Sequence, residues 1–166
     1  MSENAPKGSD SPTTLPPVTI YTGGSCIPNP GQGGYAAILT GRRTILEISG
    51  GEPETTSNRM ELTAVIAGLE RLTNPAPVIV VSDSRYLIDG TSRWMTGWID
   101  RHWKNVENDD LWRKIETLKE RYDIDWRWIA GHSGHRFNER ADRLAAMASQ
   151  RQTPLERRLY RRPKAA

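Results

Sequence analysis

The feature that most constrains the fold is a short strand-forming run that stops at two glycines. Residues 18–22 are Val-Thr-Ile-Tyr-Thr, in which side chains alternate between two faces at the period of a β-strand. Gly23 and Gly24 follow, and then serine, asparagine and proline interrupt the pattern. We therefore expect a strand that ends in a tight loop near Gly23 and lies at the centre of a sheet. Ligands of α/β proteins bind beyond such strand ends.

A second run predicts a strand that is buried on both faces. Residues 77–83 are Pro-Val-Ile-Val-Val-Ser-Asp, which is almost wholly apolar and β-branched. Strands of this composition lie inside sheets and run parallel to a neighbour. The run ends on the carboxylate of Asp83.

The remaining elements predict a mixed sheet with helices packed on it. Strands over residues 35–40 and 44–49 flank Gly41-Arg42-Arg43 and indicate a hairpin, which forms an antiparallel meander with the first strand. A further strand is expected over residues 124–129. Helices are expected over residues 57–72, 84–103, 108–122 and 138–148, the first capped by Thr56 or Ser57. This order is typical of an α/β domain.

Length and charge favour one domain with two polar ends. The chain has 166 residues, which suits a single domain. Residues 1–16 have the composition of a disordered leader, residues 17–150 form the expected domain, and residues 151–166 form a basic tail. The tail holds six basic residues and one acidic residue, a net charge of +5. Because the whole chain has a net charge of +3, residues 1–150 carry −2. The domain must therefore bind any polyanion through local patches or metal ions.

Cysteine and hydropathy patterns exclude some classes of protein. Cys26 is the single cysteine, which rules out an intramolecular disulfide. No apolar run approaches the length of a membrane span, and we see no signal peptide. We expect a soluble, cytoplasmic protein that is a monomer and does not contact membranes.

Three acids are candidate metal ligands. Glu61 lies in the first turns of a predicted helix, Asp83 ends the buried strand, and Asp142 lies one turn into the last helix. Each one alone could be a cap or a solvated helix residue. Carboxylates gathered at one edge of a sheet repel each other unless they are protonated or bridged by cations, so convergence would favour a hard ion such as Mg²⁺.

Seven ordered motifs carry a resemblance to a known family. They are Thr22-x-Gly24-Ser25-Cys26, Asn29-Pro30-Gly31, Gly33-Gly34-Tyr35, Asn58-Arg59-Met60-Glu61-Leu62, Ser82-Asp83-Ser84-x-Tyr86, Gly131-His132-x-Gly134-His135 and Asn138-Glu139-Arg140-Ala141-Asp142. Over residues 17–148 the chain resembles type 1 ribonuclease H, close to the bacterial ribonuclease HI form. The resemblance implies a ribonuclease H-like α/β fold with a five-stranded mixed sheet in the order 3-2-1-4-5.

The resemblance also implies an activity and its cofactor. The expected reaction is endonucleolytic hydrolysis of the RNA strand of an RNA/DNA hybrid, leaving 5′-phosphate and 3′-hydroxyl ends. Glu61, Asp83 and Asp142 correspond to ligands of two Mg²⁺ ions, for which Mn²⁺ can substitute. His132 resembles the family's mobile histidine, which helps move protons or release product; a loop histidine without a role is the alternative.

The chain departs from the family at one position of the site. Gly23 stands where the family has its first catalytic aspartate, which is expected to bridge both metal ions. If that ligand contributes about 3 to 5 kcal/mol of transition-state stabilisation, its loss slows the reaction by about 10² to 10⁴. We expect the fold to survive. The sequence leaves open whether Gly23 is an inactivating substitution or a natural variant. It also leaves open whether the chain is a metal-dependent nuclease or a non-catalytic hybrid-binding protein with a residual site.

The resemblance assigns substrate contacts to several residues. Asn29, Ser57 and Asn58 correspond to contacts with the minor groove and the 2′-hydroxyls, and Arg85 stands where many relatives have glutamine. Trp98, Arg101 and Lys104 correspond to the family's hybrid-binding helix and basic protrusion, although packing in the core is an alternative for Trp98 and its neighbour Trp94. The basic tail could attract phosphates, or it could be solvated and disordered.

Overall fold

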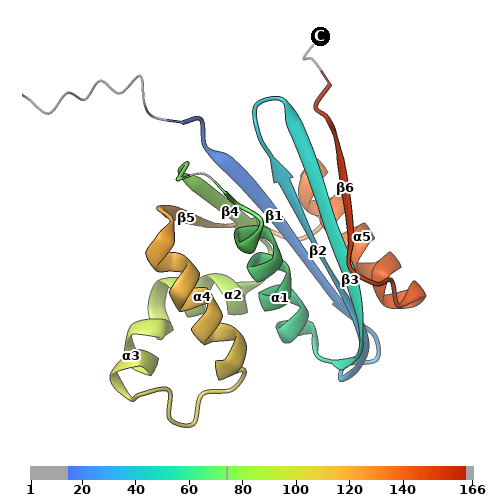
Figure 1. Cartoon of the computed structure of the whole chain (residues 1–166). Helices are drawn as coiled ribbons and strands as arrows, with labels where there is room; N and C mark the ends of the chain where they lie inside the picture. Colours follow the sequence, from blue (N-terminus) through green and yellow to red (C-terminus); the bar gives the residue numbers. More distant parts are fainter. Residues whose placement is uncertain (1–14, 74, 164–166) are drawn as a thin grey trace, which may run out of the picture.

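The computed structural model describes residues 15–163 except residue 74, and it forms a mixed sheet with helices on both faces (Figure 1). The strands are β1 Val18–Cys26, β2 Gly31–Thr40, β3 Thr44–Thr55, β4 Val78–Ser82, β5 Ile124–Trp128 and β6 Glu156–Arg161. Their spatial order is β5-β4-β1-β2-β3-β6. β4 is parallel to both β1 and β5, whereas β2, β3 and β6 pair antiparallel with their neighbours. The predicted ribonuclease H-like order is confirmed, with a sixth strand added.

The described residues also form six helical segments. They are α1 Ser57–Glu70, α2 Arg85–Asp89, η1 Gly90–Trp94, α3 Met95–Asp100, α4 Asp109–Arg121 and α5 Arg136–Arg151. The Thr56 hydroxyl caps α1 by accepting the backbone N–H of Arg59 at 3.1 Å. The long helix expected after Asp83 is instead interrupted by the π-helical turn η1. That turn begins at Gly90, whose missing side chain leaves room for the buried Trp112 ring.

The first strand does not end at its glycines. β1 continues to Cys26, because Gly23 pairs with Ala36 and Gly24 pairs with Tyr35 of β2. The expectation of a loop near Gly23 was therefore wrong. Glycine is tolerated inside this strand because other backbones approach it closely on both faces.

Three glycines on adjacent strands allow α5 to pack closely against the sheet. Gly23, Gly34 and Gly51 lie on the adjacent strands β1, β2 and β3, and a Cβ on each would collide with the backbone of α5. The residues they meet are Ala141, Asp142, Ala145, Ala148 and Ser149, which recur along one face of α5, and Gln152, which follows the helix as its C-cap. We call these three glycines the glycine track.

Gly23 and Gly24 are adjacent in β1 and allow a helix to approach the strand closely on each of its two faces. A Cβ at Gly23 would lie 2.6 Å from the Ala141 carbonyl carbon, and one at Gly24 would lie 2.7 Å from the backbone nitrogen of Glu61. Successive strand residues point to opposite faces, so α5 and α1 approach from opposite sides. The glycine pair therefore brings two acid-bearing helices to one point of the sheet.

The basic tail contributes an ordered edge strand. β6 pairs with β3 from Thr44 to Ser49, and the Tyr160 hydroxyl donates to Glu47 at 3.0 Å. Arg140 of α5 donates to both oxygens of the same carboxylate, at 2.8 and 3.1 Å. We call Glu47, Arg140 and Tyr160 the Glu47 cluster. It ties the tail and α5 to one buried side chain of β3.

The leader expected over residues 1–16 lies almost wholly outside the described residues. Among the helices that the structure describes, none is both long and apolar enough to cross a bilayer.

Candidate active site

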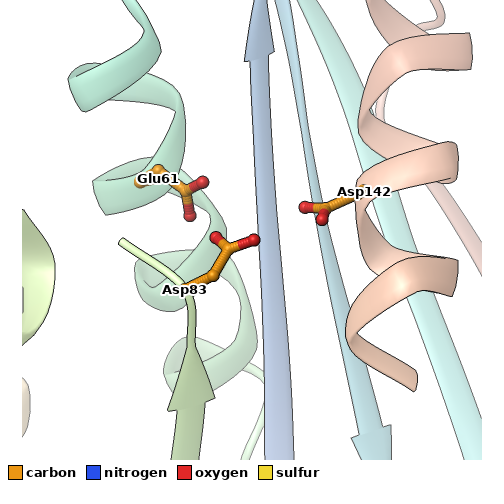
Figure 2. Close-up of side chains that lie close together, drawn as sticks. All are labelled: Glu61, Asp83 and Asp142. Carbon is orange, nitrogen blue, oxygen red and sulfur yellow. The ribbon is translucent and has the colours of Figure 1, made fainter. Parts of the chain in front are cut away.

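Three carboxylates from three different elements meet beside β1. Glu61 comes from α1, Asp83 follows the last residue of β4, and Asp142 comes from α5. One oxygen from each can be chosen so that all three lie within 4.8 Å of one another. Figure 2 shows the three side chains directed toward one another across the β1 ribbon. The convergence that the resemblance implied is therefore present in the structure.

Asp83 is held at the end of β4 by neighbours from two other segments. The buried Asn138 side chain donates to its Oδ2 at 3.4 Å, and the Trp128 indole N–H donates to its backbone carbonyl at 3.2 Å. A Cβ at Gly131 would lie 3.0 Å from the same Oδ2, so the loop before α5 passes close to the carboxylate. The Asp83 side chain is only half-buried and remains open to a ligand.

The site strongly disfavours three negative charges without a cation. Burial raises the pKa of Glu61 well above its ordinary value, and the charges of Asp83 and Asp142 raise it further. Burial, followed by the charge of Asp83 and a hydrogen bond to it, raises the pKa of Asp142 to about 7. Glu61 is only 8% exposed, and its Oε2 has no hydrogen-bond partner. A buried oxygen without a partner is costly, which favours a ligand at this point.

The donor set fits a hard divalent cation. Carboxylate oxygens are the preferred ligands of Mg²⁺, and Glu61 offers an oxygen that no protein group satisfies. Gly23 is buried beside this group and contributes no side-chain ligand. The space that its Cβ would need is filled by the backbone of Ala141 and Asp142.

His132 differs from the three carboxylates in that it is exposed to solvent and has a left-handed backbone conformation. It is exposed, adopts a left-handed backbone with φ 54°, and stands in the loop between β5 and α5. Its neighbour Gly131 packs against Asp83, so the loop borders the site. A role for His132 in proton transfer stays a prediction.

Three predicted substrate contacts lie together at the start of α1. The Asn29 side-chain oxygen accepts the backbone N–H of Ser57 at 3.2 Å, which joins the loop after β1 to the helix that carries Glu61. Asn58 is the next residue and is exposed. Ser57 and Asn58 lie in the first turn of the helix that carries Glu61, and their contact with substrate stays a prediction.

Arg85 lies over an aromatic ring that sequence reasoning did not single out. Its guanidinium carbon is 3.8 Å from the centre of the Trp128 ring, and Trp128 is 39% exposed. The N–H of the same indole donates a hydrogen bond to the backbone carbonyl of Asp83. The alternation of residues 124–129 predicted the strand, but only the pairing of β5 with β4 places Trp128 beside Asp83.

The predicted hybrid-binding helix packs on the protein through Met95 and Trp98, and most of its other residues are exposed. Trp98 is half-buried among other tryptophan rings, with ring centres 5.0 Å from Trp112 and 6.1 Å from both Trp94 and Trp103. Trp94 is 41% exposed. Arg101 and Lys104 are exposed in the turn after α3. Contacts of these residues with DNA stay predictions.

The fold and the site together define a ribonuclease H-like α/β protein with a cluster of three acids that could hold a metal ion. The RNase H family model matches residues 16–150, and the chain belongs to this family. It is 52% identical over 136 residues to a ribonuclease H of Granulibacter bethesdensis, covering 79% of this chain and 91% of the relative. It is 51% identical over 135 residues to the ribonuclease HI of Caulobacter vibrioides, covering 78% and 91%. The relatives thus support the ribonuclease H class of enzyme.

Solved structures share most of this fold. LC9-RNase H1, a type 1 RNase H with the type 2 active-site motif, has a TM-score of 0.79 and 33% identity, covering 89% of this chain and 79% of that one. The N-terminal RNase H domain of a Mycobacterium tuberculosis protein has a TM-score of 0.66 and 27% identity, covering 82% and 96%.

Proposed function

We propose that this chain hydrolyses the RNA strand of RNA/DNA hybrids, leaving 5′-phosphate and 3′-hydroxyl ends, at a rate lowered by Gly23. The observation that carries the proposal is the convergence of Glu61, Asp83 and Asp142 within 4.8 Å in a chain of the RNase H family. The site lies where α1, β4 and α5 meet, beside the exposed polar groups at the start of α1.

The carboxylates would hold the metal that the reaction requires. In the family's two-metal mechanism, Mg²⁺ supplies an activated water and neutralises charge on the leaving 3′-oxygen. Glu61, Asp83 and Asp142 are the ligands this chain offers, and Asn138 orients Asp83 through its side-chain N–H. Asn29, Ser57 and Asn58 would bind 2′-hydroxyls, which distinguish RNA from DNA. His132 would carry a proton to the leaving oxygen from its exposed loop.

Gly23 lowers the rate without removing the fold. The missing carboxylate would contribute about 3 to 5 kcal/mol, so we expect a rate about 10² to 10⁴ below that of a complete site.

A non-catalytic hybrid-binding protein is the alternative. One observation favours it: α5 backbone fills the space that a side chain at position 23 would need. In that case Asn29, Ser57 and Asn58 would still bind hybrid, whereas no metal-dependent cleavage would follow.

Cleavage of an end-labelled RNA/DNA hybrid in Mg²⁺ and in Mn²⁺ tests the proposal. We expect slow cleavage by this chain, faster cleavage by Gly23→Asp, and none by Asp83→Asn, which controls for contaminating nuclease. Equal rates for this chain and Gly23→Asp would mean that the site works without the carboxylate. If neither version cuts and both bind hybrid, the binding-protein alternative replaces the enzyme.

A cytoplasmic location and a monomeric state belong to the same proposal. Sedimentation of the purified chain at several concentrations tests the second, since a dimer would appear as a concentration-dependent increase in mass.

A further inference from the structure

We infer that this chain binds one divalent cation, held jointly by Glu61, Asp83 and Asp142, where its family's mechanism uses two. The inference rests on the metal site of the proposed function, and it departs from that function in the number of ions. Three features of the site support it: the size of the acidic group, the packing at Gly23 and the charge balance.

The acidic group has the size of one coordination sphere. Its three oxygens lie within 4.8 Å of one another. Opposite ligands of an octahedral Mg²⁺ ion are about 4.2 Å apart, because each bond is about 2.1 Å long. Adjacent ligands of the same ion are about 3.0 Å apart, so the three carboxylates must draw together by rotation of their side chains to contact one ion. The unpartnered Oε2 of Glu61, on a side chain only 8% exposed, gives the ion a ready ligand.

A second ion lacks the ligand that would bridge it to the first. Paired catalytic ions lie about 3.5 to 4 Å apart and need a shared oxygen ligand between them. Position 23 offers none, and a side chain there would require the backbone of α5 to shift. A Cβ at Gly23 would lie 2.6 Å from the carbonyl carbon and oxygen of Ala141 and 2.8 Å from the nitrogen of Asp142. The backbone of α5 therefore packs where the Cβ of a bridging residue would lie.

The charge balance also favours one ion. Three ionised carboxylates with one divalent cation leave a net charge of −1, whereas two cations leave +1 in a partly buried site. Among the described residues, no fourth acid belongs to the group. Glu139 is close enough to raise the pKa of Asp142, but it accepts the backbone N–H of Gly134 at 3.2 Å instead. A second cation would therefore be repelled by the first without compensation.

Counting bound Mn²⁺ tests the inference without requiring activity. The free chain is titrated with Mn²⁺ at neutral pH, and unbound ion is measured by its electron paramagnetic resonance signal. We expect one bound ion per chain, with binding at least tenfold weaker in Asp83→Asn and in Glu61→Gln. Two ions per chain, or no saturable binding, would overturn the inference. One ion that is unaffected by both substitutions would overturn it as well.

Position 23 supplies a matched pair of variants. Gly23→Asp adds the carboxylate, and Gly23→Asn adds a side chain of the same size without the charge. We expect a second ion in the aspartate variant and one ion in the asparagine variant. If Gly23→Asp fails to fold, the count for the unaltered chain still decides.

The hybrid-cleavage assay keeps the two proposals separate. One bound ion without any cleavage would refute the proposed function and leave this inference standing. Two bound ions with cleavage would do the reverse.

Discussion

At the scale of single residues, Gly23 and Gly24 determine where the acids stand. Neither glycine is required by a positive φ; both are required by the approach of a helix backbone. Gly24 admits the start of α1 with Glu61, and Gly23 admits α5 with Asp142. Gly23 therefore has two effects: it leaves the site without one carboxylate, and it allows α5 to bring Asp142 close to the sheet.

Gly23→Ala tests this packing role. We expect the free energy of unfolding to fall by about 1 to 3 kcal/mol, because the new methyl group meets backbone atoms that cannot rotate away. Urea denaturation measures the change. The matched control is Gly97→Ala in α3, where a Cβ meets nothing within 4 Å; it is expected to stabilise by about 0.5 to 1 kcal/mol. A neutral Gly23→Ala would show that α5 is not seated on Gly23.

The raised pKa of Asp142 predicts how the metal-free protein responds to pH. Its pKa rises from 3.8 to about 7 on folding, so the unfolded chain releases this proton first as pH increases. Stability without metal should therefore fall between about pH 4 and pH 7 and then level off. Glu61 acts in the same direction. The lowered pKa of Glu47 acts oppositely and matters only in acid, below its ordinary value of 4.5.

Thermal melts in a chelator at pH 5 and pH 8 measure this effect. We expect a lower melting temperature at pH 8, recovery on adding Mg²⁺, and a much smaller pH difference in Asp142→Asn. A melting temperature that rises from pH 5 to pH 8 would contradict the assigned burial of these carboxyls.

At the scale of elements, the Glu47 cluster fixes how α5 lies on the sheet. Arg140 reaches Glu47 on β3, Ala141 rests on Gly23, and Asp142 points toward Asp83. Burial raises the pKa of Glu47, but hydrogen bonds from Arg140 and Tyr160 outweigh that effect and hold the pKa below its ordinary value. The tail strand thereby contributes to the rotation of the helix that carries Asp142.

Substitutions in the Glu47 cluster should differ in size. Tyr160→Phe removes one hydrogen bond and is expected to cost about 1 kcal/mol. Arg140→Ala leaves a buried carboxylate without its cation and is expected to cost about 2 to 4 kcal/mol, since part of the pair is exposed. Chemical denaturation provides both values, with the exposed Arg157→Ala on the same strand as a near-neutral control. Equal effects for Tyr160→Phe and Arg157→Ala would exclude a role for the tyrosine hydroxyl.

At the scale of the whole molecule, hybrid binding must come from a local patch, since the domain has no net positive charge apart from its tail. Arg101 and Lys104 are exposed in a turn that also holds four non-glycine residues in left-handed conformations, namely His102, Trp103, Asn105 and Asn108. Such turns persist only where the surroundings hold them, which suits a rigid substrate-binding surface.

Alanine at Arg101 or Lys104 should weaken hybrid binding and reduce its salt dependence. Each lost phosphate contact lowers the slope of log K against log salt by about 1. Fluorescence anisotropy with a labelled hybrid, at several salt concentrations, measures both quantities. Arg43→Ala, in the turn between β2 and β3, is the control. Identical slopes for all three variants would remove this turn from the binding surface.

Periodicity predicted most of the strands and helices, and the ends of these elements drew attention to the three acids, whereas the strand order came from the resemblance to type 1 ribonuclease H. Sequence patterns did not predict β6, since Glu156–Arg161 is charged and lacks the alternation of a half-buried strand. They also ended β1 too early, because glycine usually interrupts a strand and only tertiary contacts with α1 and α5 show why it is needed. Trp128 was missed for the same reason: its place beside Asp83 depends on pairing between β4 and β5.

The most direct test of the account is a diffraction experiment on crystals soaked in Mn²⁺, with data collected near the manganese absorption edge. The account predicts one anomalous peak per chain, coordinated by Glu61, Asp83 and Asp142 and adjoining the backbone at Gly23. No peak between these carboxylates at saturating Mn²⁺, or a peak that contacts none of them, would contradict it.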